Sequence, residues 1–228
     1  MIEIGYAYDT PLLNLVEGQP RRLTYSEFKG MDSNADDPLM KCPITRDFMK
    51  NSYLVPVHFH GLLTINEINA DGTVAYEENL SGLSHLEIRP QQNKTCLLEA
   101  SGNGIHFFSD VPDVQMVMQP SPMSALSTQM RGIINIYESP RKIHLCWYAK
   151  EKDLFTFHKD VHDMMVTFVV PNNETVSLVP CSVPDVCTMW GGIEKNNRVS
   201  RLMNWKKVFN RFGKLRPRNQ VEKFRLDR

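Results

Sequence analysis

The sequence lacks the patterns of a membrane-spanning or exported chain. Its 228 residues contain no apolar run of about 18 residues, so no transmembrane helix is expected. The start, MIEIGYAY, has no basic region followed by an apolar one, so we expect no signal peptide. These absences predict a cytoplasmic protein that is not secreted through a signal peptide.

The sequence also lacks paired cysteines. It has five cysteines, an odd number, and no CxxC spacing. They are Cys42, Cys96, Cys146, Cys181 and Cys187. This pattern predicts reduced thiols, several of them buried as small apolar side chains, rather than a disulfide framework.

No internal repeat and no catalytic signature occur. Neither a Ser/His/Asp nor a Cys/His arrangement carries the surrounding residues of a known family. The sequence Gly102-Asn103-Gly104 resembles a phosphate loop but lacks the Lys-Ser/Thr pair and the helix that should follow, so it predicts a turn. No cofactor is therefore expected.

Strand-forming residues are dense between residues 132 and 182. Residues 163–170 alternate between two faces that are both mostly apolar, which predicts a strand buried on both sides. Pro171, Asn172 and Asn173 then predict a turn, and residues 175–179 a second strand that ends at Pro180. We expect this pair to form a hairpin.

The rest of the chain predicts further short strands and little helix. Strands are expected over residues 2–8, 21–25, 53–59, 62–68, 73–76, 86–89, 95–99, 105–108, 133–137 and 143–148. A short helix is expected over residues 43–50, a long loop over 9–41 and irregular chain over 111–129. The predicted fold is mainly β: an antiparallel β-sandwich or open barrel over residues 1–183, followed by a basic helical segment over 184–228.

Charge is unevenly distributed although the net charge is zero. Residues 195–228 hold twelve Lys and Arg against two acids, a local charge of +10, which leaves −10 for the rest. A helix over residues 202–212 would carry one apolar stripe. The predicted interaction arm consists of Leu202, Trp205, Lys206, Lys207, Phe209, Arg211, Phe212, Arg216 and Arg218. This arm suits an acidic protein surface, nucleic acid, or the chain's own acidic body.

Two histidines form a candidate metal site. His58 and His60 lie two apart on a predicted strand, so both project from one face. Glu67 or His106 could complete a ligand set of the kind that cupin-like metalloenzymes use. The alternative is a pair of histidines on a half-exposed face without metal.

One stretch resembles a known family. Cys42-Pro43, Asp47, Lys50-Asn51 and Tyr53 resemble the CP…D…KNTF/Y opening of an uncharacterised family encoded by tailed bacteriophages. The resemblance spans residues 42–180, and its later landmarks are Phe107-Phe108-Ser109, Gly132 with Asn135-Ile136, and the strand ending at Pro180. It implies a phage origin, a mostly β fold, and a place in the host-cell cytoplasm or the virion. It implies no catalytic residues.

These observations favour a non-enzymatic phage-type binding or assembly protein. Its loops and basic arm would contact a protein partner, or other copies of the chain, through an acidic surface. A cupin-like metalloenzyme using His58 and His60 remains an alternative. So does a nucleic-acid-binding accessory factor that acts through residues 195–228.

We predict five thiols per chain in the native protein, because neither the number nor the spacing of the cysteines suits disulfide pairing. Thiol titration after denaturation should find all five. A mass increase on reduction would contradict the prediction.

Overall fold

Strands dominate the part of the chain that the structure, a computed structural model, describes. The described residues are 1–8, 19–24, 43–56, 59–82, 85–91, 93–121, 131–137, 141–157, 164–183 and 220–226. The strands are β1 (Ile2–Tyr8), β2 (Arg21–Arg22), β3 (Ser52–Val55), β4 (Phe59–Ile68), β5 (Val74–Gly82), β6 (His85–Pro90), β7 (Thr95–Ser109), β8 (Gln115–Pro120), β9 (Gly132–Asn135), β10 (Arg141–Lys150), β11 (Leu154–Phe157), β12 (Met164–Val169) and β13 (Val176–Pro180). The helices are α3 (Pro43–Lys50), α7 (Gln220–Phe224) and the short 3₁₀ turn η2 (Pro171–Asn173).

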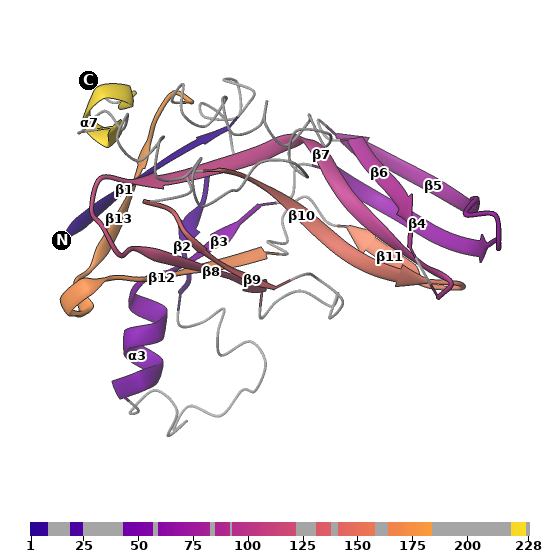
Figure 1. Ribbon diagram of the computed structural model, residues 1–228, viewed down its shortest axis with the longest axis horizontal. Coiled ribbons are helices and arrows are strands. Elements are labelled where there is room, and N and C mark those ends of the chain that lie inside the picture. Colours follow the sequence, from indigo (N-terminus) through magenta and orange to yellow (C-terminus); the bar gives the residue numbers. More distant parts are fainter. Residues whose placement is uncertain are drawn as a thin grey trace, which may run out of the picture.

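The strands form three sheets arranged as two lobes (Figure 1). Sheet A has the order β10-β7-β1-β13, with β6 also pairing β7; sheet B has the order β2-β3-β12-β8-β9; sheet C has the order β11-β4-β5. Sheet A runs through both lobes. Sheet B packs against one end of it to form the proximal lobe, and sheet C packs against the other end to form the distal lobe. The described strands close no barrel, and the predicted mainly β, sandwich-like fold is confirmed.

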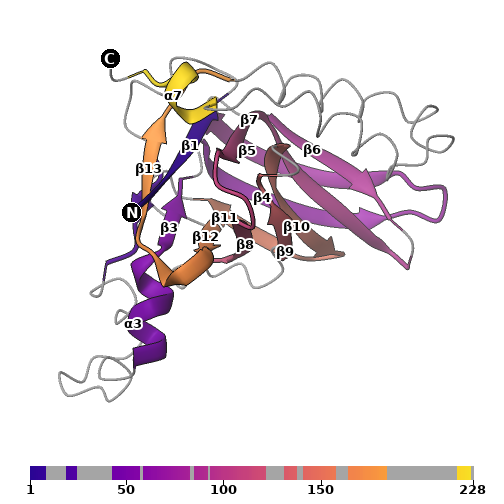
Figure 2. The same cartoon turned by 60° about the vertical axis from the view of Figure 1, so that its left-hand side comes forward.

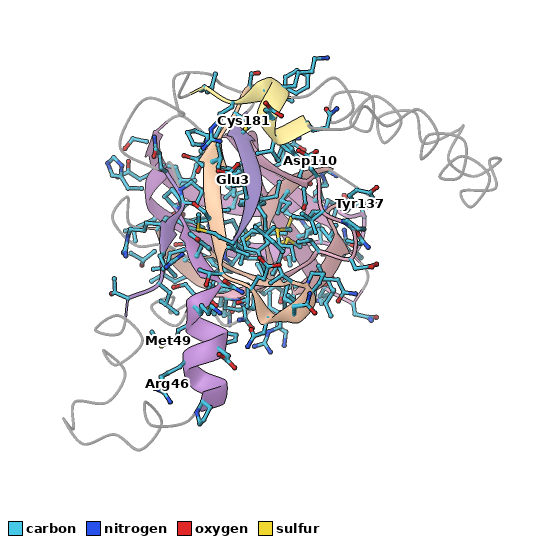
Figure 3. All side chains as sticks on the ribbon, turned by 90° about the vertical axis from the view of Figure 1, so that its left-hand side faces the viewer. Glu3, Arg46, Met49, Asp110, Tyr137 and Cys181 are labelled. Atoms are coloured by element: carbon cyan, nitrogen blue, oxygen red, sulfur yellow. The ribbon has the colours of Figure 1, made fainter. Side chains whose placement is uncertain are left out.

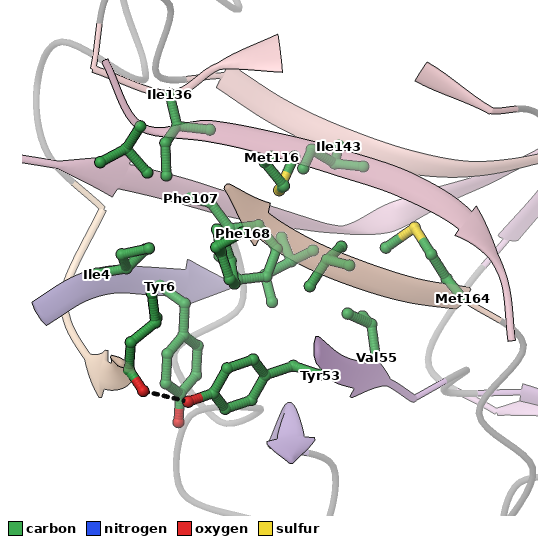
Figure 4. Packing of buried hydrophobic residues seen from close by; sticks show 14 of the residues in the cluster. Ile4, Tyr6, Tyr53, Val55, Phe107, Met116, Ile136, Ile143, Met164 and Phe168 are labelled. Carbon is green, nitrogen blue, oxygen red and sulfur yellow. Dashed lines mark hydrogen bonds between the residues drawn. The ribbon is translucent and has the colours of Figure 1, made fainter. Parts of the chain in front are cut away.

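The core of the proximal lobe lies between sheets A and B (Figure 4). Ile4 and Phe107 enter it from sheet A, and Val166 and Phe168 from sheet B. The rings of Phe107 and Phe168 meet edge to face with centroids 5.6 Å apart, a favoured geometry for aromatic pairs. Each fully buried side chain of this size contributes roughly 1.5–3 kcal/mol.

The core of the distal lobe lies between sheets A and C. Leu63 and Phe155 come from sheet C, and Leu98 and Trp147 from sheet A. The Trp147 and Phe157 rings meet edge to face with centroids 5.2 Å apart. Strands β7 and β10 are long enough to contribute side chains to both cores, so the two lobes share one sheet.

Two local predictions are confirmed in detail. Helix α3 covers the predicted residues, beginning at Pro43, which suits the first helical position. Strand β12 is buried on both faces: Val166 and Phe168 point into the proximal core, while Met165 packs with Met49 of α3 on the opposite side. Helix α3 therefore covers part of the outer face of sheet B.

The predicted hairpin between residues 163 and 179 is wrong. Strand β13 pairs in parallel with β1 in sheet A, because both edges of β12 are already occupied by β3 and β8. The turn residues do behave as predicted: Asn172 and Asn173 have φ of 54° and 51°, in the left-handed region that Asn tolerates. The turn leads the chain from β12 in sheet B to β13 in sheet A instead of joining two neighbouring strands of one sheet.

The structure differs from the predictions in three further places. The turn predicted at Gly102-Asn103-Gly104 is wrong, because residues 95–109 form one continuous strand, β7, with which β10 pairs on both sides of a register shift between Ile143 and Leu145. Strand β8 lies in the region expected to be irregular, and it pairs with β12 and β9. Strand β11 was not predicted. The expected helix over 202–212 and most of the expected loop over 9–41 lie outside the described residues.

Side chains beside α3 hold the start of β13. The Asn51 side chain accepts a hydrogen bond from Val176 N at 2.9 Å and donates one to Glu174 O at 2.8 Å. Tyr53 donates its hydroxyl proton to Val176 O at 2.8 Å (Figure 4), and Arg22 donates to the same oxygen at 2.9 Å. These bonds satisfy backbone groups at the outer edge of β13, where a sheet would otherwise present unpaired donors and acceptors.

We predict that Asn51→Ala lowers the free energy of unfolding by about 2–4 kcal/mol, because it removes two hydrogen bonds and leaves the buried Val176 N–H without its acceptor. Urea unfolding measures the change. Asn69→Ala is the control: its side chain bonds only Thr73 at an exposed turn, so a change below about 1 kcal/mol is expected. Equal effects of both substitutions would contradict the proposed role of Asn51.

Candidate functional site

The end of the chain returns to the body and docks on sheet A (Figure 2). Helix α7 is held there by Asp110, which directly follows β7. One Asp110 carboxylate oxygen accepts from Gln220 N at 2.6 Å and the other from Val221 N at 2.9 Å. These backbone groups at the start of a helix have no partner within the helix, so the carboxylate caps it. We call residues 220–226 the latch.

A small apolar cluster lies beneath the latch. Val221 is buried against Ala7, Phe108, Val179 and Cys181. Gly5 is required by this packing, because a Cβ at residue 5 would stand 2.3 Å from a Phe108 ring carbon. The latch is therefore seated on a surface shaped by β1, β7 and β13.

The latch also closes the far end of the β13 edge. Ser182 N donates to Phe224 O at 2.8 Å, and Leu226 N donates to Pro180 O at 3.0 Å. Cys181 and Arg225 form an antiparallel bridge between these bonds. The Arg225 guanidinium donates to both carboxylate oxygens of Glu3, at 3.1 and 3.2 Å. Figure 3 shows Glu3, Asp110 and Cys181 below α7, at the same end of the molecule.

The latch turns the predicted arm into a loop that is closed at its base. Residues 184–219, which we call the basic loop, connect Val183 to Gln220. They carry nine Lys and Arg against two acids. Every residue of the predicted interaction arm falls within the basic loop and outside the described residues. The sequence missed the latch because its contacts come from β1, β7 and β13, which are distant in the chain.

The predicted metal ligands do not come together where they are described. His60 lies exposed at the start of β4, where its Nε2 is 2.9 Å from Ser81 Oγ. Glu67 lies seven residues further along the same strand, about 20 Å away. His106 is buried in sheet A beside Ala7, and His58 is not among the described residues. In the described ranges, no three His, Cys, Asp and Glu side chains are grouped so that they could hold a metal ion.

The described cysteines carry thiols, as predicted for Cys96, Cys146 and Cys181. Burial raises the pKa of Cys146 to about 11, and the neighbouring Glu99 carboxylate adds to this shift. Burial also raises the pKa of Cys96 to about 11. Both groups are protonated at neutral pH, whereas the thiolate is the nucleophilic form of cysteine. Neither position suits nucleophilic catalysis.

Comparison with known proteins found no relative, so inferences about function rest mainly on the geometry. No protein-family model, curated protein or solved structure matches this chain. In the described part of the chain, no helix is long and apolar enough to cross a membrane.

We predict that Asp110→Asn loosens the latch, because one carboxylate oxygen becomes an NH2 group that faces a backbone N–H. Amide hydrogen exchange at Ser182 and residues 220–226 should accelerate about fivefold or more, the effect of losing one net hydrogen bond. Exchange in β12 should stay unchanged.

Asp113→Asn is the matched control for this prediction. It removes the same charge three residues away, at an exposed position that no α7 hydrogen bond involves. Equal acceleration in both variants would show that charge, rather than capping by Asp110, holds the latch.

Proposed function

We propose that the protein is a non-enzymatic binding or assembly protein that contacts an acidic protein surface through its basic loop. The observation that carries the proposal is the latch. It ties both ends of the loop to one end of the body, with Ser182 N and Phe224 O only 2.8 Å apart. A loop closed at its base has fewer conformations than a free tail, so less entropy is lost when it binds.

The latch also engages two acidic groups of the body. The Asp110 carboxylate is occupied by the start of α7, and the Glu3 carboxylate by Arg225. Because Arg225 pairs with the Glu3 carboxylate, an acidic surface that approaches the latch meets less repulsion from Glu3. This supports binding of an anionic partner at this end of the molecule.

The composition of the loop favours a protein partner. Trp205, Phe209 and Phe212 recur at helical spacing, with Lys206 and Lys207 off that stripe. An amphipathic element with this pattern lays its apolar face on an apolar surface, while its basic flank meets acidic side chains. The resemblance to the tailed-bacteriophage family supports a partner among virion or assembly components, in the host cytoplasm or the virion.

The proposal predicts salt-sensitive binding to an acidic polypeptide. The native chain should bind immobilised polyglutamate, and raising the salt concentration should weaken binding because exposed charges are screened. Replacing Lys206, Lys207 and Arg211 with Gln should weaken binding about tenfold or more.

The control for this experiment removes three exposed positive charges from the body: Arg46→Gln, Arg131→Gln and Lys150→Gln. It should retain most of the binding. Equal losses in both variants would count against the loop as the binding element. Preference for single-stranded DNA over polyglutamate at equal salt would favour the nucleic-acid alternative.

A further inference from the structure

The outer face of sheet C exposes apolar side chains. Leu62 on β4 is 47% exposed and Leu154 on β11 is 61% exposed. Leu154 pairs with Thr64, and Leu62 with Thr156, so the two leucines are diagonal neighbours on one face. Their strand neighbours Leu63 and Phe155 point into the distal core. The inner face of sheet C is thus apolar, and its outer face places two exposed leucines beside Thr64 and Thr156.

Acidic residues also lie on sheet C. Glu77 pairs with Thr64 and shares its side of the sheet. Residues 59–82 and 154–157, which form sheet C and its hairpin turn, contain four acids and no Lys or Arg. These acids are Glu67, Asp71, Glu77 and Glu78, and all are exposed. Glu67 and Glu77 lie on the outer side with the two leucines, whereas Glu78 pairs with Leu63 and lies on the inner side. The outer face therefore combines apolar and acidic side chains, which complement an apolar stripe with basic flanks.

Helix α7, which follows the basic loop in the chain, and sheet C lie at opposite ends of the molecule. Figure 1 places α7 at one end of the long axis and β4 and β5 at the other. Charge follows the same division among the described residues. The distal lobe (residues 59–82, 85–101 and 145–157) has eight acids and four bases, and the other described residues have six acids and nine bases. Two copies placed head to tail bring unlike charges together.

The latch restricts what the loop can reach on its own body. Eight residues separate Phe212 from Gln220, which extend to at most about 28 Å. Leu98, which packs beneath sheet C, is twelve residues from the capping residue Asp110, about 40 Å along β7. The outer face of sheet C is a further sheet spacing away, about 10 Å. With the latch closed, Phe212 falls short of this face, so the stripe of the same chain cannot lie on it along its whole length.

We propose that the outer face of sheet C is the docking surface for the basic loop of a second copy of this chain. The apolar stripe lies on Leu62 and Leu154, and the basic flanks meet Glu67 and Glu77. This inference rests on the proposed binding role of the loop. The two contact surfaces differ, so the contact is heterologous and builds rings or open chains of copies.

The test uses two full-length variants that are each defective in one surface. The face variant carries Leu154→Lys and Glu77→Lys, both at exposed positions where the fold tolerates change. The stripe variant carries Trp205→Ala and Phe209→Ala. The control carries Ile133→Lys and Asp47→Lys, which make the same charge change on exposed residues of sheet B and α3. Circular dichroism verifies that each variant is folded.

Sedimentation velocity over a range of protein and salt concentrations gives the result. The native chain and the control should self-associate, more weakly in high salt. Each variant alone should associate at least about tenfold more weakly, a loss typical of a central interface residue. An equimolar mixture of the face and stripe variants should form a one-to-one dimer and nothing larger, because only one intact pair of surfaces remains.

Three outcomes would overturn the inference: a native chain that stays monomeric, a variant mixture that forms no dimer, or a control that dissociates like the face variant. The polyglutamate experiment separates this failure from failure of the proposed function. A monomeric native chain that still binds polyglutamate through its loop retains the proposed function and loses only the second copy as partner.

Discussion

The continuous ladder of β7 is the constraint on which the rest of the fold depends. Its first half pairs with β6 and β10, and its second half with β1 and β10. Leu98 on the first half enters the distal core, and Phe107 on the second half enters the proximal core. Because one strand serves both cores, the two lobes cannot pack independently. The latch is also seated on this strand, since the capping carboxylate of Asp110 follows its last residue.

Closure of the β13 edge is the second organising feature. A terminal strand presents a row of unpaired backbone groups that can recruit another strand. Here Asn51 and Tyr53 occupy the groups of Val176 at the start of β13, and the latch occupies those of Pro180 and Ser182 at its end. The same bonds that protect the edge also close the base of the basic loop. The contacts of the latch thus protect the edge and also hold the two ends of the basic loop together.

Charge is distributed unevenly between the two lobes among the described residues. A chain with zero net charge has no overall field to keep copies apart. Because acids exceed bases in the distal lobe and bases exceed acids among the other described residues, attraction between copies depends on their orientation. Complementary charge increases the rate and specificity of association more than its strength. The exposed leucines of sheet C and the aromatic stripe of the loop would then supply apolar burial.

The sequence by itself determined the local elements and the class of fold. Alternation and turn residues identified the double-sided strand β12, the helix α3 and the left-handed Asn172 and Asn173, because these depend on neighbours in the chain. The basic segment was equally visible as a run of like charge. Only the tertiary structure decided the partner of β13, the continuity of β7 and the seat of the latch. Strand pairing depends on which edges are already filled, and the Asp110 contact joins residues 110 positions apart in the chain. No pattern among neighbouring residues indicates the strand pairing or the Asp110 contact.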